Sequence, residues 1–339
     1  MKKIRVAING FGRIGRAFVR QVWNRPEIEL IAINDLGSPE TAAYLLKYDT
    51  VYGRAPFTVE RRDGVLMIDG REVTLFAEKD PMALPWKDLA IDVVVEATGA
   101  FNDYEKASVH INAGARRVVI TAPAKGDEGP GKGATVLMGV NEELLSTCPV
   151  TSNASCTTNS GSPMIAILDE TVGIAHAMLS TTHAYTATQA IVDGASKKDL
   201  REGRAAAQNI IPSSTGAAIA VTKAYPSLAG KFDGISLRVP VPVGSIADIT
   251  FVAKRDTSAE EINDILRKAA AEDRWKGIFA ATDEPLVSSD IIDDRHASIA
   301  DLAMTRVVDK RLVKVLAWYD NEAGYTHTLV EHVIKAANV

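Results

Sequence analysis

A thiol among small polar side chains is the first feature of this sequence that could do chemistry. It belongs to Cys156, inside the stretch SNASCTTN at residues 152–159. The next segment, GSPMIAILDE, has apolar residues at helical spacing, which predicts that Cys156 lies where a loop turns into a helix. The first N–H groups of a helix lack intrahelical partners and carry the positive end of its dipole, so they favour the thiolate. Further along, TTHAYTATQ offers His183 as a partner base, and the two residues together predict nucleophilic chemistry at sulfur.

The run GFGRIG near the N-terminus has the spacing of a phosphate-binding turn. Gly10 permits a tight turn, Gly12 lets the backbone approach a pyrophosphate, and Gly15 lets the following helix pack closely on a sheet. A β-rich strand precedes the run, and a second strand ends at Asp35, whose carboxylate can accept hydrogen bonds from both ribose hydroxyls. The pattern predicts dinucleotide binding, because a turn that only packs a helix on a sheet would leave Asp35 unexplained.

The first half of the chain alternates apolar strands with helical segments, which is typical of a parallel sheet. The strand ends Thr98, Gly99 and Thr121 would meet the cofactor at the carboxyl edge of that sheet. Residues 125–133 are predicted to form a solvated hairpin rather than a phosphate-binding loop, followed by a strand. The expected strands cover residues 4–8, 28–34, 91–99 and 117–121.

The second half has a different pattern. Its strands are long and alternate apolar with polar residues, and one of them carries Arg238, which favours an antiparallel sheet with one open face. A helix over residues 257–273 begins with the capping pair Ser258 and Glu261. The second half is therefore predicted to be α+β.

Composition and charge exclude several classes of protein. The 339 residues are 46% hydrophobic and 24% charged with a net charge of −5, as in a soluble globular protein, and no block of five like charges suggests a nucleic-acid or membrane partner. Two cysteines, Cys148 and Cys156, do not form a secreted disulfide framework, and the six histidines show no metal-binding spacing. No apolar run is long enough to span a bilayer, so a cytoplasmic enzyme without a metal is expected.

The motifs together resemble phosphorylating glyceraldehyde-3-phosphate dehydrogenase. The matching stretches are AINGFGRIGR, LLKYDT, SNASCTTN, THAYTATQ, IIPSSTGAA, RVPVP and WYDNEAGY, in the order of that family. The resemblance implies a homotetramer that oxidises an aldehyde with a nicotinamide cofactor and inorganic phosphate. It implies a Rossmann-type doubly wound parallel sheet plus an α+β catalytic domain with a mostly antiparallel sheet. The expected dinucleotide-binding domain spans residues 1–155 and is completed by a helix at 321–339, and the catalytic domain spans residues 156–320.

The resemblance also implies roles for individual residues. Cys156 would attack the aldehyde to give a thiohemiacetal, and its backbone N–H would help hold the developing oxyanion. His183 would take the proton and assist phosphate attack on the thioester. The resemblance places the substrate's own phosphate at Thr186 and Arg238, and the attacking phosphate at Ser155, Thr157, Thr215 and Gly216. The cofactor-lining positions are Arg13, Ile14, Asp35, Lys79 and Thr121, with Asn321 orienting the nicotinamide amide.

Four positions depart from the pattern of many family members. Ser160 replaces a second cysteine and Ala323 replaces a tryptophan, which could loosen the end of the nicotinamide pocket. Glu202 stands where many members have arginine, and Ala195 where strictly NAD-dependent members have proline. Asp35 repels a 2′-phosphate, so NAD is expected to be preferred with NADP use possible.

Three other functions fit the sequence less well. Erythrose-4-phosphate dehydrogenase is the alternative within the same chemistry, but HAYTATQ favours the triose enzyme. An idle scaffold or RNA-binding protein conflicts with the intact site and the negative charge, and a cysteine hydrolase leaves GFGRIG unexplained.

The remaining polar residues are expected to be structural. Cys148 should be buried, Arg204 should form an ion pair, the Lys197–Lys198 pair should be solvated, and His110, His296, His327 and His332 should be surface or satisfied residues.

Overall fold

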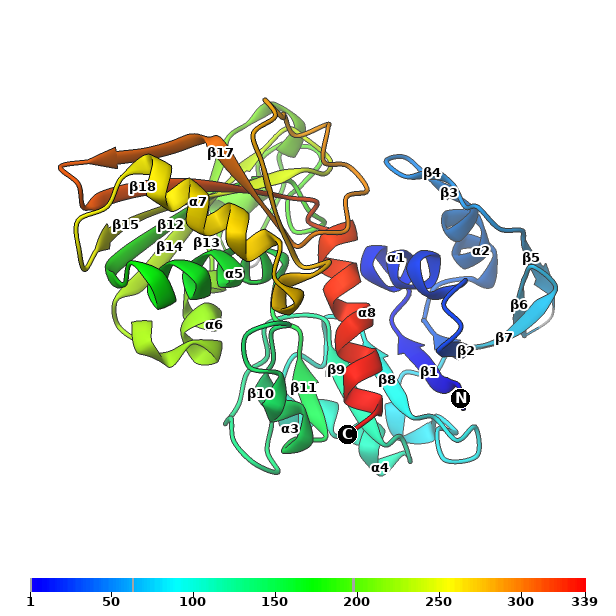
Figure 1. Ribbon diagram of the computed structural model, residues 1–339. Helices are drawn as coiled ribbons and strands as arrows, with labels where there is room; N and C mark the ends of the chain where they lie inside the picture. Colours follow the sequence, from blue (N-terminus) through cyan, green and yellow to red (C-terminus); the bar gives the residue numbers. More distant parts are fainter. Residues whose placement is uncertain (1, 63, 197–198) are drawn as a thin grey trace. The chain divides into compact units, whose positions relative to one another are not determined.

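The computed structural model describes residues 2–62, 64–196 and 199–339. The chain divides into two compact units, traced in Figure 1. The first unit contains residues 1–154 and 326–339, and the second unit contains residues 155–325. The Lys197–Lys198 pair lies outside the described residues, so its predicted solvation stays a prediction.

The first unit is built on a nine-stranded sheet in the order β10-β11-β9-β8-β1-β2-β7-β6-β5. The strands from β10 to β7 are parallel to their neighbours, and β6 and β5 add an antiparallel edge. The strands are β1 (Ile4–Asn9), β2 (Ile28–Asn34), β5 (Val59–Arg62), β6 (Val65–Ile68), β7 (Arg71–Phe76), β8 (Val93–Glu96), β9 (Arg117–Ile120), β10 (Ala134–Thr135) and β11 (Val150–Ser152), with a separate pair β3 (Tyr48–Asp49) and β4 (Gly53–Arg54). This is the predicted α/β sheet.

Helices cover this sheet on both faces, which is why its central strands are mostly apolar. On β9, Val118 and Ile120 pack with Tyr104 of α3, whereas the neighbouring Thr151 on β11 hydrogen-bonds His332 of α8. Since successive residues of a strand point to opposite faces, α3 and α8 lie on opposite sides of the sheet (Figure 1). The helices are α1 (Arg13–Val22), α2 (Pro39–Lys47), α3 (Tyr104–Ala107), α4 (Val109–Asn112) and α8 (Ala323–Ala337), which starts in the second unit, with 3₁₀ turns η1 (Pro81–Ala83) and η2 (Glu142–Ser146).

Two strand predictions in the first unit were too long. The predicted strand at residues 91–99 is paired only from Val93 to Glu96, and the strand expected after residue 133 is only β10. In the second case the Asn141 side chain accepts from the Leu137 N–H and donates to the Thr135 carbonyl, so it takes the hydrogen bonds that a ladder would need. The predicted hairpin before β10 contains a single bridge, between Gly129 and Gly133.

The second unit is built on a seven-stranded mixed sheet in the order β13-β14-β12-β15-β18-β17-β16. The pairs β12–β14 and β16–β17 are parallel and the other neighbours are antiparallel, as predicted for a mostly antiparallel sheet. The strands are β12 (Ile174–Ala184), β13 (Ile211–Ser214), β14 (Phe232–Val239), β15 (Ser245–Ala253), β16 (Phe279–Thr282), β17 (Ser298–Val308) and β18 (Leu312–Tyr319). The helices are α5 (Cys156–Thr171), α6 (Ala217–Ala224) and α7 (Ala259–Ala270), with 3₁₀ turns η3 (Leu200–Gly203), η4 (Ala206–Gln208), η5 (Pro226–Leu228) and η6 (Asp273–Trp275).

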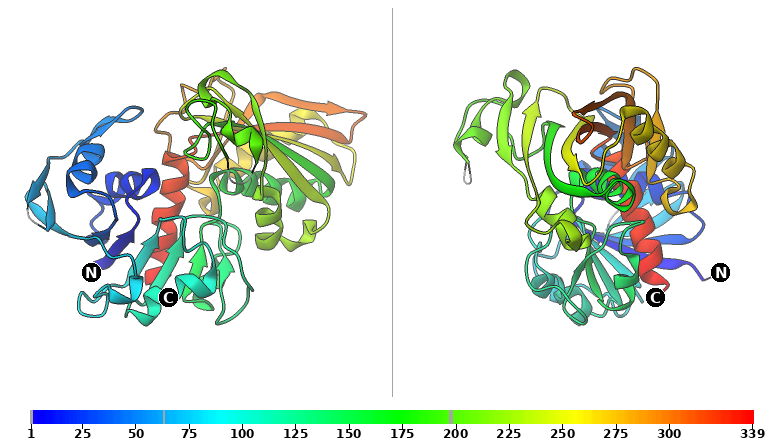
Figure 2. Two further views of the ribbon diagram at one scale, coloured as in Figure 1. Left: turned by 180° about the vertical axis from the view of Figure 1, so that it is seen from behind. Right: turned by 60° about the vertical axis from the view of Figure 1, so that its left-hand side comes forward.

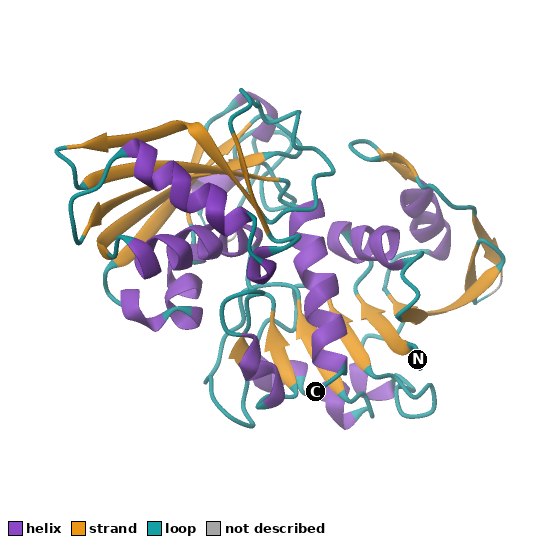
Figure 3. Cartoon of the chain, viewed as in Figure 1, coloured by secondary structure: helices purple, strands orange, loops and turns teal. Residues whose placement is uncertain are grey.

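The two faces of this sheet differ. Helices α5, α6 and α7 lie on one face (Figure 3), and seen from behind the strands lie in front of them (Figure 2). Along β12, Leu179 and Thr181 point toward the helices and are buried, whereas Met178 points the other way and is 57% exposed. The amphipathic α7 begins as predicted, with the Ser258 hydroxyl accepting from the Glu261 N–H.

Candidate active site

The thiol stands at the first residue of α5, as the sequence predicted. Ser155 is the N-cap, and its hydroxyl accepts a hydrogen bond from the Thr158 N–H at 3.1 Å. The preceding residue, Ala154, has a positive φ of 54°, which is uncommon for a residue with a side chain. This bend lets a buried strand end and a helix begin within a few residues, with Cys156 at the junction.

The alternation of β12 brings His183 to the same place. Odd-numbered positions from Ala177 onward point to the face covered by α5, and His183 continues this series at 3% exposure. Its Nε2 atom lies 3.3 Å from the Cys156 Sγ, within the distance of a sulfur hydrogen bond. The ring of Tyr319 meets the imidazole edge-on at a centroid distance of 5.9 Å and limits its rotation. The structure therefore brings together the two residues predicted to do the chemistry.

The register of the sheet places Arg238 next to His183. Strands β12 and β14 are parallel and His183 stands opposite Arg238. The Arg238 Nη1 lies 2.5 Å from the His183 Nδ1, which also lies 2.6 Å from the Ala184 carbonyl oxygen. A guanidinium always donates, so its contact requires a lone pair on Nδ1, whereas the carbonyl requires a hydrogen there. The two contacts therefore demand opposite tautomers. In addition, the Arg238 Nε is buried without a hydrogen-bond partner.

The electrostatics of the pair differ from the sequence prediction. Burial raises the pKa of the Cys156 thiol, and the opposing effects of Arg238 and of N–H groups in the first turn do not reverse this. Burial, and then the charge of Arg238, lowers the pKa of His183 to about 3. Near neutral pH the resting pair is a neutral thiol beside a neutral imidazole. The pKa of the Cys156 thiol is thus raised rather than lowered as predicted, because the effect of burial exceeds those of Arg238 and of the hydrogen bonds from Thr157 and the Cys156 backbone.

The residues predicted for the attacking phosphate lie at the starts of two helices. The Thr158 hydroxyl on α5 lies 3.5 Å from the Ala217 carbonyl oxygen at the start of α6. Thr215 and Gly216 lead into α6, and Gly216 is its N-cap. The Thr157 hydroxyl is turned to the Tyr319 hydroxyl at 2.9 Å, so its side chain is already engaged. Thr186, predicted to bind the substrate's own phosphate, follows the end of β12 and hydrogen-bonds Gln189.

A pocket of about 510 Å³ lies at the carboxyl ends of the parallel strands in the first unit. Of the predicted cofactor residues, it is lined by Gly10, Gly12, Asp35, Lys79 and Thr98. The Asp35 carboxylate accepts from the Phe11 N–H at 2.6 Å and from the Gly37 N–H at 2.7 Å, which fixes its orientation at the pocket wall.

The glycine turn beside this pocket is tightly packed on one side and open on the other. Gly10 has a φ of 96°, and a Cβ there would lie 2.5 Å from the Thr98 nitrogen. A Cβ on Gly15 would lie 2.4 Å from the Gly10 carbonyl oxygen, whereas one on Gly12 would meet no atom within 4 Å. The space beside Gly12 is what a bound phosphate would need.

The other predicted cofactor residues are not among the residues that line this pocket. Arg13 and Ile14 begin α1, and the Arg13 guanidinium forms an ion pair of 2.5 Å with Asp49. Gly99 and Thr121 follow β8 and β9. Asn321 belongs to the second unit, where its Oδ1 accepts from the Gly244 N–H and the Ser245 hydroxyl, each at 3.1 Å.

Sequence reasoning missed one residue of the reactive cluster. The Tyr319 hydroxyl bonds both Thr157 and Thr181, and its ring supports His183. Its position directly before DNEAG at the end of a strand was the available signal, because the neighbouring Asn321 was singled out there. The Ser160 hydroxyl, where many members have cysteine, is buried without a hydrogen-bond partner.

The described residues show neither a metal cluster nor a membrane-spanning helix. No group of three or more histidine, cysteine, aspartate or glutamate side chains is placed to hold a metal ion. Within the same residues, none of the helices has the length and apolarity needed to cross a membrane.

Comparisons with known proteins agree with these sites. Residues 4–104 match the model of the glyceraldehyde 3-phosphate dehydrogenase NAD binding domain, and residues 155–321 match that of the C-terminal domain. The chain is 50% identical over 330 residues to a glyceraldehyde-3-phosphate dehydrogenase of Thermotoga maritima, covering 96% of this chain and 97% of that protein. It is 46% identical over 337 residues to one of Zymomonas mobilis, covering 98% of each. The chain therefore belongs to the glyceraldehyde 3-phosphate dehydrogenase family.

Proposed function

We propose that this protein oxidises glyceraldehyde 3-phosphate to 1,3-bisphosphoglycerate with NAD and inorganic phosphate. The observation that carries the proposal is the Cys156 Sγ at the start of α5, 3.3 Å from the His183 Nε2 and beside Arg238. Where the His183 Nε2 carries a lone pair, the neutral thiol beside it has its proton acceptor in place, so attack on an aldehyde and loss of the proton can occur together.

The reaction would proceed in two halves at the same sulfur. The Sγ of Cys156 bonds to the aldehyde carbon while its proton passes to the His183 Nε2, giving a thiohemiacetal whose oxygen faces the first N–H groups of α5. When bound, a nicotinamide cofactor would supply the hydride acceptor needed to convert the thiohemiacetal into a thioester. A phosphate oxygen then attacks the thioester carbon, and Cys156 leaves as the sulfur nucleophile for the next turnover.

The tautomer of His183 decides whether Nε2 can accept that proton. With Arg238 donating to Nδ1, the ring hydrogen must sit on Nε2, and the nitrogen facing the thiol then has no lone pair. When Nδ1–H instead donates to the Ala184 carbonyl, Nε2 can accept. A substrate phosphate offers Arg238 a stronger acceptor than a neutral imidazole, so its binding favours the productive tautomer. The partnerless Arg238 Nε supports an anionic ligand at this position.

The remaining assignments follow the family pattern residue by residue. Thr186 and Arg238 hold the substrate's phosphate, and the starts of α5 and α6 hold the attacking phosphate through hydroxyl and N–H groups. In the first unit, the pocket at the strand ends holds NAD, with Asp35 on a ribose. Asp35 favours NAD over NADP because a 2′-phosphate would be repelled, and Ala195 in place of proline leaves NADP use possible. The first unit is thus the dinucleotide-binding domain, and the second unit is the catalytic domain.

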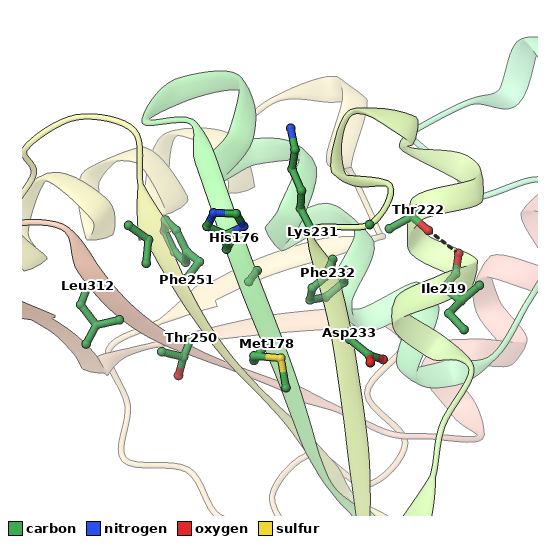
Figure 4. Close-up of a pocket in the computed structure, with 13 residues that line it drawn as sticks. His176, Met178, Ile219, Thr222, Lys231, Phe232, Asp233, Thr250, Phe251 and Leu312 are labelled. Atoms are coloured by element: carbon green, nitrogen blue, oxygen red, sulfur yellow. Dashed lines mark hydrogen bonds between the residues drawn. The ribbon is translucent and has the colours of Figure 1, made fainter.

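A homotetramer in the cytoplasm is the proposed working form. The uncovered face of the second sheet carries apolar side chains, with Met178 57%, Ile235 51% and Leu312 44% exposed. Figure 4 shows Met178 and Leu312 at a pocket of about 680 Å³ on this face. A second copy seated there would bury these side chains. Light scattering should give a mass about four times 36.3 kDa, and Ile235→Asp should lower it; a monomeric mass for the wild-type protein would refute the assembly.

The activity is tested by following absorbance at the reduced-nicotinamide band with glyceraldehyde 3-phosphate and NAD. We expect sustained turnover only with inorganic phosphate present, and without it a burst of at most one equivalent per site. Erythrose 4-phosphate, tested in parallel, should give a much lower kcat/KM. Sustained turnover without phosphate would show hydrolysis of the thioester and would contradict the phosphorylating step.

A further inference from the structure

A chain of buried hydrogen bonds runs beneath the pocket of the first unit, and apart from Thr98 its residues have none of the roles assigned above. Its centre is Glu96, at the end of β8, whose side chain is fully buried. The Oε1 atom accepts from the Thr98 N–H at 2.8 Å and from the Thr98 hydroxyl. The Oε2 atom accepts from the Asn9 amide at 2.6 Å and lies 3.1 Å from the His110 Nε2. Four donors therefore surround one carboxylate.

The far end of the chain fixes which nitrogen of His110 carries the hydrogen. The Trp86 indole N–H lies 3.0 Å from the His110 Nδ1, and an indole N–H can only donate. The Nδ1 must therefore be the acceptor, so the Nε2 carries the hydrogen and donates it to Glu96. Trp86 and His110 are both fully buried. The Asn9 amide nitrogen also lies 3.4 Å from the His110 Nε2, but it donates to Glu96 at the shorter distance of 2.6 Å, so the Nε2 hydrogen remains directed to Glu96. The carboxylate is held in one place by a chain that cannot easily rotate.

The near end of the chain forms part of the pocket. The Asn9 Oδ1 accepts from the Asn34 amide at 2.7 Å. The Asn34 Oδ1 accepts from the Glu78 N–H at 2.8 Å, and its amide nitrogen donates to the Glu78 carbonyl oxygen at 2.9 Å. Asn9, Asn34, Glu78 and Thr98 all line the pocket. They follow or end the neighbouring strands β8, β1, β2 and β7, so the chain links four strand ends across the carboxyl edge of the sheet.

Burying a carboxylate among neutral donors is costly compared with an apolar floor of the same shape. The arrangement is therefore expected to serve the pocket more than stability. We propose that Glu96, held by His110 and Trp86, is a positioning residue for the dinucleotide, because it fixes Asn9 and Thr98 at the pocket wall. This inference rests on the proposed function in that the pocket is taken to hold NAD. It adds a set of residues that touch the cofactor only through others.

The main test is the variant Glu96→Gln in the full-length protein. A glutamine turns N–H groups toward either the Thr98 donors or the Asn9 and His110 donors, so one set loses its acceptor. Since an unpaired buried donor is costly and would displace Asn9 or Thr98 at the pocket wall, we expect the Kd for NAD, measured by calorimetric titration, to rise about tenfold or more. The KM for NAD should rise with it, while kcat at saturating NAD stays within about twofold of wild type.

Two further variants separate positioning from stability. His110→Gln keeps an N–H donor for Glu96 and His110→Phe removes it, so NAD affinity should fall in that order. The matched control is His332→Gln, because His332 is also a fully buried histidine of the first unit but bonds Thr151 and Asn153 away from the pocket. This control should lower the melting temperature and leave the Kd for NAD unchanged.

The outcomes distinguish this inference from the proposed function. If Glu96→Gln binds NAD as tightly as wild type, or if NAD affinity follows melting temperature across all variants including His332→Gln, the positioning role is overturned. If Glu96→Gln does not fold, the order of the two His110 variants decides in the same way. A wild-type protein that does not bind NAD would refute the proposed function instead.

Discussion

The two buried polar clusters of this protein differ in how completely their hydrogen bonds are specified. In the first unit, Trp86 can only donate to His110 and Glu96 can only accept from it, so one arrangement satisfies all three. In the second unit, Nδ1 of His183 contacts both Arg238 and the Ala184 carbonyl, which require opposite tautomers. A fully specified cluster holds a shape, whereas a cluster with competing partners can move a proton at small cost. The comparison predicts that the first cluster affects binding and the second affects the rate of the chemical steps.

The two clusters also differ in how many of their buried polar atoms lack a hydrogen-bond partner. Around the second cluster, the Arg238 Nε and the hydroxyls of Ser160 and Ser236 are buried without partners. Such groups are costly, and they are commonly found where a ligand completes the network. In the first cluster, all acceptor positions of the Glu96 carboxylate are used. The reactive region is therefore the one whose buried polar groups are not all paired within the protein.

The largest effect is expected from removing the sulfur. Cys156→Ala should lower kcat by on the order of 10⁴-fold or more, because no other group can form the covalent intermediate. The Kd for NAD should stay close to wild type. Cys148→Ala is the matched control, since Cys148 is 1% exposed in the first unit and should affect only stability. Steady-state kinetics and NAD titration measure both; substantial turnover in Cys156→Ala would refute the covalent route.

The next largest effect concerns the competing contact at His183. Arg238→Gln should lower kcat/KM for glyceraldehyde 3-phosphate by on the order of 10²-fold, because a charged hydrogen-bond partner is lost. With unphosphorylated glyceraldehyde the loss should be much smaller, since Nδ1 is then no longer held by a guanidinium. Arg204→Gln is the control, because Arg204 forms an exposed ion pair with Asp193. Equal losses on both aldehydes would show that Arg238 acts only through its charge on the thiol.

A smaller effect is expected at the wall of the first-unit pocket. Asp35→Asn should raise the KM for NAD by about tenfold and raise relative NADP use, because the like charge that repels a 2′-phosphate is removed. The value of kcat at saturating NAD should change little. Initial rates on both cofactors at equal concentration measure this. A large fall in kcat would break the division between binding and rate, and a wild-type preference for NADP would show that Asp35 does not set cofactor choice.

The smallest effect is on stability and comes from two histidines whose pKa values are lowered by burial. The pKa values of His183 and His332 fall to about 3 from 6.5. Between these values the unfolded chain binds protons that the folded protein does not, so stability is present above pH 6.5 and is lost as the pH falls toward 3. Each histidine contributes a slope of about 1.4 kcal/mol per pH unit in that window.

The variant that checks this linkage is His332→Gln. Urea unfolding at several pH values between 4 and 6.5 should show a shallower loss of stability than in wild type, although the variant is less stable at pH 7. A slope equal to that of wild type would mean that His332 is protonated alike in both states. The same variant should leave turnover intact, which separates it from His183.

Much of the fold could be predicted because pattern and structure agree locally. The alternation of β12, the glycine spacing before α1 and the capping residues of α7 each fix an element within a few residues. The prediction failed where a side chain replaced a ladder, as Asn141 does after β10. An apolar run predicts burial, but whether it is paired in a sheet depends on a contact that no local pattern shows.

The candidate site could be predicted in its residues but not in its electrostatics. Cys156 and His183 were identified from their neighbours in the sequence, and the structure places them 3.3 Å apart. The direction of the thiol pKa shift depends on burial by residues far apart in the chain, which exceeds the opposing effects of Arg238 and of the N–H groups at the helix start. Glu96 and His110 were missed as a pair for the same reason, because a buried carboxylate at a strand end is visible only once its donors are placed.

Helix α8 has a consequence for how the protein is made. Its residues from Thr326 onward belong to the first unit, although the whole second unit separates them from Ala154 in the chain. The contacts of His332 with Thr151 and Asn153 therefore join segments that are synthesised far apart in time. During translation, residues 326–339 leave the ribosome only after the whole second unit has been synthesised. The first unit therefore cannot complete its fold until the end of biosynthesis.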